Sequence, residues 1–157
     1  MTLPTIHLAG TLDPRDSWEA ASCPIAAALG VVGARSAFLI LREAFYGTTR
    51  FDDFAKRAGI SEPVAAARLA ELVEEGLLTR ERYQDPGKRA RMEYRLTDKG
   101  SDFLPVLTGL MQWGDKWSSA ARVEMQHRGC GEIVHAELRC GKGHPLDASD
   151  IELVART

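Results

Sequence analysis

The spacing of apolar residues predicts two helices at the start of the folded region. Residues 23–33 (CPIAAALGVVG) are small and apolar, and Pro24 stands in the first turn, where a missing N–H costs nothing. Residues 36–45 (SAFLILREAF) are apolar on almost every side, with Ser36 as the expected N-cap. We therefore expect a short buried helix followed by a helix through the centre of a small domain.

Two more helices follow, and only a few residues around Gly59 separate them. The first presents one apolar face, formed by Phe51, Phe54 and Ala58. The second covers residues 61–76, with Ser61 as the expected N-cap and Gly76 as the stop. Its expected core stripe comprises Val64, Leu69, Leu72 and Val73. A short helix, a tight turn with glycine and a second capped helix are typical of a helix-turn-helix.

After Gly76 the apolar period changes from that of a helix to that of a strand. Residues 77–84 and 91–97 predict two strands, and Asp85-Pro86-Gly87 between them is a strong turn signal. This β-hairpin directly after the helix pair is a wing. Thr97 is then expected to cap another helix, which Pro105 should kink or interrupt early.

These elements predict a mainly α fold with a small β-hairpin wing (α+β), that is, a winged helix-turn-helix. The expected domains are an N-terminal arm (1–22), the winged helix-turn-helix (23–97), a dimerisation helix (98–121) and a small extension (122–157). The extension is irregular or β, with short strands expected near 132–134 and 136–139.

Composition narrows the function classes only a little. The chain has 157 residues and a net charge of −2, so a nucleic-acid partner would need local positive charge. No apolar run approaches the ~20 residues of a membrane span, and the N-terminus has no signal-peptide pattern. Three widely spaced cysteines do not form a secreted disulfide framework. We expect a cytoplasmic protein with no membrane partner.

The 61–76 helix has the residue types that a major-groove helix needs. Its outward side offers small or polar residues, which allow the backbone to approach base edges. Ser61 marks a helix N-terminus that can face a phosphate, Ala66 can touch a thymine methyl, and Arg68 can bind guanine or phosphate. The alternative is an alanine-rich surface helix with no ligand.

The predicted wing carries a local excess of positive charge. Six cations lie between Thr79 and Arg95, against three acids, and Lys88, Arg89 and Arg91 cluster at or beside the hairpin tip. Long cations there can reach phosphates or a narrow minor groove. A solvated basic turn is the alternative, but the order helix, turn, helix, basic hairpin favours DNA binding. The predicted DNA-contacting set comprises Arg50, Ser61, Glu62, Pro63, Ala66, Arg68, Lys88, Arg89 and Arg91.

Residues 23 to about 117 resemble the HxlR-type regulators. The shared pattern has Cys-Pro at the first helix, a buried L-I-L-R-E helix and G-x-x-R-F at the next. It continues through I-S and R-L-x-x-L-x-x-x-G-L to a wing that closes on Y-x-L-T-x-x-G. The resemblance implies a bacterial winged-helix repressor or activator that dimerises through its N- and C-terminal helices.

The helix from Thr97 onward has more bulky apolar surface than a small domain needs for itself. Paired with the first helix of a second copy, it could form a two-fold interface that holds two recognition helices ~34 Å apart on a palindromic operator. The alternative is an intramolecular core. The predicted interface comprises Ile25, Leu29, Phe103, Leu107, Leu110, Met111, Trp113 and Trp117.

The cysteines suggest two further hypotheses. Cys23 precedes Pro24 at a helix start, where the helix dipole favours thiolate, so it is a redox candidate for an oxidant or small-molecule effector. The alternative is a small buried hydrophobe. In the extension, Cys130, Cys140 and His144 are weak metal candidates because their spacing lacks the paired units of a zinc ribbon. We expect no cofactor and no metal.

No catalytic motif stands out. A phosphate-binding glycine loop, an H-E-x-x-H sequence, a nucleophile elbow and a Ser/His/Asp set are all missing from the sequence, so we do not expect an enzyme. The remaining alternative function is a winged-helix module for protein–protein contacts that does not bind DNA.

Overall fold

The computed structural model describes residues 5–13, 15, 23–84, 86–87, 90–118 and 123–155. These residues form two compact parts, and each is described by itself below. The larger part covers residues 28–119, and the smaller part combines residues 1–27 with residues 120–157.

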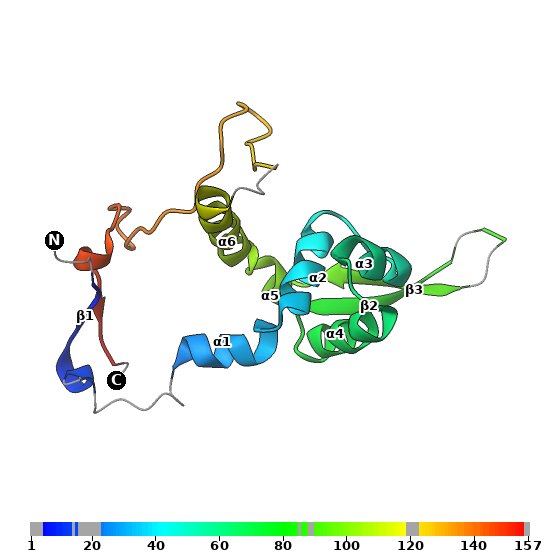
Figure 1. The fold of residues 1–157 in the computed structure, drawn as a ribbon, viewed down its shortest axis with the longest axis horizontal. Coiled ribbons are helices and arrows are strands. Elements are labelled where there is room, and N and C mark those ends of the chain that lie inside the picture. The colour runs from blue at the N-terminus through cyan, green and yellow to red at the C-terminus, as the bar shows by residue number, and fades with distance from the viewer. Residues whose placement is uncertain are drawn as a thin grey trace. The chain divides into compact units, whose positions relative to one another are not determined.

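The fold class predicted from the sequence is confirmed: several helices pack against the base of a small antiparallel hairpin (Figure 1). The helices of this region are α1 (Pro24–Val32), α2 (Arg35–Phe45), α3 (Phe51–Ala58), α4 (Glu62–Glu74), α5 (Asp98–Ser101) and α6 (Leu104–Trp117). The hairpin consists of β2 (Leu78–Tyr83) and β3 (Arg91–Leu96).

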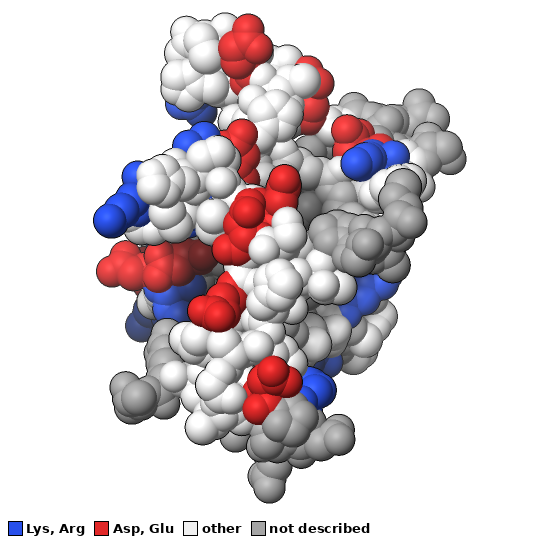
Figure 2. Space-filling model, turned by 90° about the vertical axis from the view of Figure 1, so that its left-hand side faces the viewer, with Lys and Arg blue, Asp and Glu red and all other residues white. Residues whose placement is uncertain are grey.

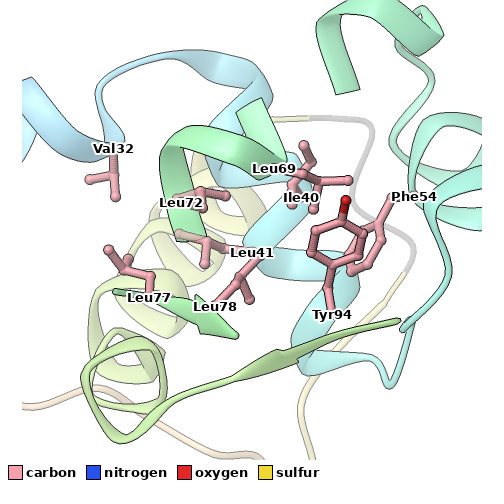
Figure 3. Packing of buried hydrophobic residues seen from close by; sticks show 9 residues of the cluster. All are labelled: Val32, Ile40, Leu41, Phe54, Leu69, Leu72, Leu77, Leu78 and Tyr94. Atoms are coloured by element: carbon pink, nitrogen blue, oxygen red, sulfur yellow. The ribbon is translucent and has the colours of Figure 1, made fainter. Parts of the chain in front are cut away.

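One hydrophobic core holds the larger part together, and α2 runs through it as predicted. Ile40 and Leu41 of α2 are fully buried, and Tyr94 of β3 meets the Phe54 ring edge-on at 6.1 Å between centroids (Figure 3). The cluster comprises Val32, Ile40, Leu41, Phe54, Leu69, Leu72, Leu77, Leu78 and Tyr94. Because these residues come from four helices and both strands, the core fixes the helices against the base of the hairpin.

Three details of the first four helices differ from the sequence-based predictions. Helix α2 begins at Arg35 with Ala34 as its N-cap, so Ser36 is not the cap. Helix α1 is not buried, since Val32 is its one buried residue and Ile25 is 70% exposed. On α4, Val64 is 41% exposed and Ala65 is buried in its place. All three helices were predicted correctly, but the start of α2 and the burial of α1 and α4 were not.

The turn between α3 and α4 is closed by the backbone. Gly59 ends α3 with a φ of 63°, a left-handed conformation that glycine adopts without strain, and Ile60 N–H bonds the Ala55 carbonyl at 3.1 Å. Ser61 is the N-cap of α4 as predicted, although its side chain makes no capping hydrogen bond. The turn of the helix-turn-helix therefore depends on the backbone conformation of Gly59 and not on a side-chain cap.

The hairpin is in register from Leu78↔Leu96 to Tyr83↔Arg91. A third segment adds to its β3 edge, where Arg50 bridges to Glu93 and Tyr94 N–H bonds the Thr49 carbonyl at 2.8 Å. Thr97 caps the next helix as predicted, by accepting a bond from Gly100 N–H. The predicted break near Pro105 is also confirmed, because α5 and α6 are separate helices.

In the smaller part, the N-terminal segment pairs with the C-terminal one. Strand β1 (His7–Leu8) lies parallel to β4 (Glu152–Leu153), and two single 3₁₀ turns accompany them, η1 (Gly10–Leu12) and η4 (Ala148–Asp150). The strands expected at 132–134 and 136–139 are wrong as regular strands, since that region has only the isolated bridges Gln126↔Ile133 and Arg139↔Pro145. Backbone N–H and carbonyl groups of this region form hydrogen bonds that close turns instead, such as the bond from Gly131 N–H to the His127 carbonyl.

Among the described residues, no single helix has the length and apolarity to cross a membrane. Helices α1 and α2 reach that length and composition only together, and a bend of 77° separates them.

Candidate nucleic-acid interface

Helix α4 presents a face of small and polar residues away from the core. Ala65, Leu69 and Leu72 are buried, and the 3.6-residue period places Pro63 and Ala67 on the opposite side, where both are exposed. At the N-terminal end, the predicted contact residues Ser61, Glu62, Pro63 and Ala66 are all exposed. This face has neither bulky side chains nor buried polar groups that would keep a ligand away.

Arg68 lies differently from the prediction. Its side chain is 26% exposed and pairs with Glu71, and its Nε is buried without a hydrogen-bond partner among the described residues. By helical phase, Arg68 is on the flank of α4 nearly opposite Ala70 and Ala66. The guanidinium does not extend freely from the outward face.

The hairpin carries several exposed arginines, and one of them, Arg95, is ion-paired within the hairpin. Arg80, Arg82 and Arg91 are exposed on the strands, whereas Lys88 and Arg89 lie outside the described residues. Arg95 is paired with Glu93 at 2.7 Å and with Glu81 at 3.5 Å, and the hydrogen bond from Arg95 to Glu93 raises the pKa of Arg95. Arg95 is therefore neutralised within the hairpin.

A groove separates α4 from the hairpin. Helix α4 contacts β2 while α3 contacts β3, and the hairpin extends past both helices (Figure 1). The groove is lined by Phe51, Ala66, Ala70, Val73, Glu74, Arg80 and Tyr94. Its walls are mostly small and apolar, with one cation and one carboxylate among the described residues.

A second concavity lies at the base of the hairpin and gathers three arginines. Arg50, Arg80 and Arg91 line it, and the Arg50 guanidinium stacks over the Tyr83 ring at 4.9 Å from the centroid. Its other lining residues are Phe51, Asp52, Met92 and Tyr94. Sequence reasoning missed Arg80 and Tyr83 as site residues, although the alternation of the strand places Arg80 on the side of Leu78, toward the helices.

Outside the hairpin, the surface carries both acidic and basic side chains (Figure 2). In the space-filling view of Figure 2, acidic side chains are spread over the visible face, and Lys and Arg lie mostly toward its edges. A net charge of −2 thus coexists with a local gathering of arginines at the hairpin base.

The predicted dimer residues divide into two groups. Leu107 is buried, and Phe103 packs edge-on against Phe38 at 5.3 Å, so both serve their own chain's core. Met111 is half-buried, and the others are exposed to solvent: Ile25 and Leu29 on α1, and Leu110, Trp113 and Trp117 on α6. The two tryptophans are 66% and 69% exposed.

The three cysteines are free thiols in separate settings. Cys23 directly precedes α1, where its carbonyl accepts from Ala27 N–H at 3.1 Å, and it is half-buried. Cys130 Sγ lies 3.1 Å from Nδ1 of His127. Hydrogen bonds from the backbone of Lys142 and His144 lower the pKa of the Cys140 thiol. Among the described residues, no three His, Cys, Asp or Glu side chains converge as a metal site.

Comparison with known proteins identifies the family. The HxlR-like helix-turn-helix family matches residues 31–122. Among curated relatives, the HTH-type transcriptional regulator Rv3095 of Mycobacterium tuberculosis is 43% identical over 117 residues, which cover 72% of each chain. The HTH-type transcriptional regulator YdeP of Bacillus subtilis is 32% identical over 97 residues, covering 60% of this chain and 73% of YdeP.

Solved structures agree with this assignment. The crystal structure of PA1607, a protein named as a transcription factor, matches with a TM-score of 0.76 at 38% sequence identity. The match covers 85% of this chain and 95% of the PA1607 chain. The redox regulator HypR in its oxidised form has a TM-score of 0.55 at 26% identity, covering 64% of this chain and all of HypR. The reduced transcriptional regulator YodB of B. subtilis has a TM-score of 0.53 at 25% identity, covering 64% and 98%. The chain belongs to the HxlR-like helix-turn-helix family and is a transcriptional regulator of the helix-turn-helix type.

Proposed function

We propose that the chain is a sequence-specific DNA-binding regulator that acts as a homodimer. The observation that carries this proposal is the combination of an exposed, small-residue face on α4 with an arginine-bearing hairpin, built on one core and separated by a groove. Helix α4 enters the major groove, and the wing (residues 79–96) contacts the backbone or the minor groove.

The N-terminal half of α4 supplies the base-facing residues in this proposal. Ser61 and Glu62 lie at the helix start, and Pro63 and Ala66 allow close approach of the backbone to base edges. Arg68 reaches a base only by leaving Glu71, which makes it a weaker reader than the sequence suggests. On the wing, Lys88, Arg89 and Arg91 supply charge, of which Arg91 is within the described residues.

The exposed apolar side chains of α6 and α1 support dimerisation. Large apolar groups on a surface helix mark an interaction site when they are contiguous, and Trp113 and Trp117 lie one helical turn apart on α6. A two-fold dimer would repeat α4 along the duplex and so read a palindromic operator.

Cys23 is proposed as the thiol through which an oxidant or another electrophilic small molecule acts on the regulator. Its place at the start of α1, a helix of the proposed dimer interface, would couple a change at sulfur to the association of the two copies. The redox regulator HypR is among the proteins with a similar fold.

The test is the salt dependence of duplex binding, measured by fluorescence anisotropy on the DNA upstream of the gene. Binding should weaken steeply with salt, because each phosphate contact releases condensed counterions. Changing Lys88, Arg89 and Arg91 together to Ala should weaken every sequence and flatten the salt slope.

A matched control removes three cations from the smaller part, with Arg128, Arg139 and Lys142 changed to Ala. This control should bind as the wild type does. If the wild type shows no salt-dependent duplex binding, the winged helix is a protein-interaction module and the proposal is wrong.

A further inference from the structure

We propose that Cys130 and His127 form a thiol–imidazole pair that makes Cys130 a site of covalent modification by small α,β-unsaturated carbonyl compounds. The pair lies in the smaller part of the chain, beyond the residues 31–122 that match the family. It does not involve Cys23, so its failure would leave the proposed function untouched. Below, "the thiol pair" means Cys130 with His127.

The two side chains of the thiol pair lie within hydrogen-bond distance of each other. Nδ1 of His127 is 3.1 Å from Sγ of Cys130, which is within the range over which a base takes a proton from a nucleophile. Cys130 is exposed, whereas Cys23 and Cys140 are half-buried. Cys130 therefore has both a base beside its sulfur and room for a small reagent to reach it.

A closed turn holds the thiol pair together. Gly131 N–H bonds the His127 carbonyl at 2.8 Å, and Gly131 has a φ of 77°, which glycine adopts without strain. His127 N–H bonds the Glu132 carbonyl at 2.8 Å, and the bridge Gln126↔Ile133 follows next to it. Because the turn is closed by its backbone, its two reactive side chains start from fixed positions and lose little freedom when they act together.

Gly129 gives the imidazole ring its place beside the sulfur. A Cβ added at Gly129 would lie 2.8 Å from Cε1 and 3.4 Å from Nδ1 of His127. The ring therefore lies against the backbone of Gly129, in space that a side chain there would occupy. In many nucleophile–base pairs a third group orients the base, and here the bare backbone of Gly129 has that part.

The chemistry of the thiol pair needs no further reactant. In the tautomer with its hydrogen on Nε2, His127 accepts the S–H proton at Nδ1 while Sγ attacks the β-carbon of the conjugated double bond. A C–S bond forms, and the π electron pair of the double bond moves to the carbonyl oxygen as an enolate. The imidazolium then returns the proton to the α-carbon. The product is a thioether, with nothing oxidised, reduced or released.

The composition of the site favours an electrophilic carbon over a metal ion. Zinc sites in proteins use three or four protein ligands. Among the residues that the structure describes, no three His, Cys, Asp or Glu side chains gather in this way. A thiol with a base needs only two side chains, and both are present.

The first experiment follows alkylation of the full chain by acrylamide, with the adduct at each cysteine quantified by mass spectrometry over time. We expect His127→Gln to slow alkylation of Cys130 about tenfold, a modest effect for a general base because thiols are partly ionised without one. The rate at Cys140 in the same sample should stay the same and so report that the smaller part is intact. His144→Gln, a histidine outside the turn, is the matched control and should leave the Cys130 rate unchanged.

The second experiment moves the imidazole without removing it. In Gly129→Ala the added methyl group takes the place of the His127 ring, and the ring, as the end of a flexible side chain, can turn away. We expect the Cys130 rate to fall toward that of His127→Gln. Gly141→Ala is the matched control, because nothing lies within 4 Å of its added carbon, and it should leave the Cys130 rate unchanged.

Three outcomes decide the proposal. If His127→Gln leaves alkylation of Cys130 unchanged relative to Cys140, Cys130 is merely an exposed thiol and the proposal is overturned. If chain purified without chelator contains stoichiometric zinc that Cys130→Ser removes, the thiol pair belongs to a metal site and the proposal is likewise overturned. If His127→Gln also changes the Cys140 rate, the smaller part has been altered, and the comparison of Gly129→Ala with Gly141→Ala decides instead.

Discussion

At the scale of single residues, the joint between the hairpin and the helices after it depends on Thr97 and Gly100. The Thr97 hydroxyl donates to the Gly76 carbonyl at 2.6 Å and accepts from Gly100 N–H at 3.0 Å. Gly100 is buried, and a side chain there would collide with the Leu77 carbonyl oxygen and approach Leu96. The first turn of α5 therefore lies directly on the start of β2.

Replacing Gly100 should show this close approach. We expect Gly100→Ala to lower the free energy of unfolding by about 2–3 kcal/mol, because the backbone must shift to admit the methyl group. Gly109→Ala on α6 is the matched control, since nothing lies within 4 Å of its added carbon, and it should be neutral or stabilising by up to ~1 kcal/mol. Urea denaturation measures both, and equal effects would contradict the packing argument.

Cys140 provides a pH-dependent prediction. Backbone N–H groups of Lys142 and His144 stabilise the thiolate and lower its pKa. Because a lowered pKa keeps the thiolate at lower pH, alkylation of Cys140 by iodoacetamide should persist to lower pH than alkylation of N-acetylcysteine. Mass spectrometry of the Cys140 peptide over a pH series measures this, and a profile that matches N-acetylcysteine would refute it.

At the scale of elements, α6 has two sides with different roles. Leu107 and Thr108 are buried, and the Thr108 hydroxyl donates to the Leu104 carbonyl at 2.9 Å. The other side exposes Leu110, Trp113 and Trp117. A helix that uses both sides needs apolar residues around most of its circumference, which explains why its sequence pattern has no clear polar face.

The exposed side of α6 can be tested by its effect on association. We expect Trp113→Gln to raise the dissociation constant of the dimer by about tenfold or more, because large aromatic residues commonly dominate interface energies. Asp115→Gln changes an exposed residue of the same helix and should leave association unchanged. Sedimentation velocity over a concentration series measures this, and an unaffected dimer would place the interface elsewhere.

At the scale of the whole molecule, the proposed function needs two copies. One α4 makes few base contacts, whereas two copies on one duplex combine their binding energies, provided that the spacing matches the helical repeat. Dimerisation and operator affinity should therefore be linked.

This linkage predicts two chains for each palindromic duplex, measured by titration at concentrations well above the dissociation constant. Trp113→Gln should weaken binding to the full palindrome but not to a single half-site, because its recognition surface is intact. A variant that loses affinity for both duplexes equally would show that Trp113 affects folding or the DNA contact itself.

The sequence by itself determined the order and type of the main elements, because those signals are local. Gly59, which has a positive φ, ends α3 at the position that the sequence predicts. Pro105 lies at the start of α6, where the sequence predicts a break. The alternating strands around 85–87 determined the hairpin, since a period of two on both sides of a tight turn has few other solutions.

Only the tertiary structure decided which sides of these elements are used, because burial depends on neighbours distant in sequence. It buried Ala65 rather than Val64, held Arg68 against Glu71, and paired His7–Leu8 with Glu152–Leu153 across the length of the chain. The roles of the predicted DNA and dimer residues stay predictions. The gathering of Arg50, Arg80 and Arg91 follows from pairing between separate segments, which no local pattern encodes.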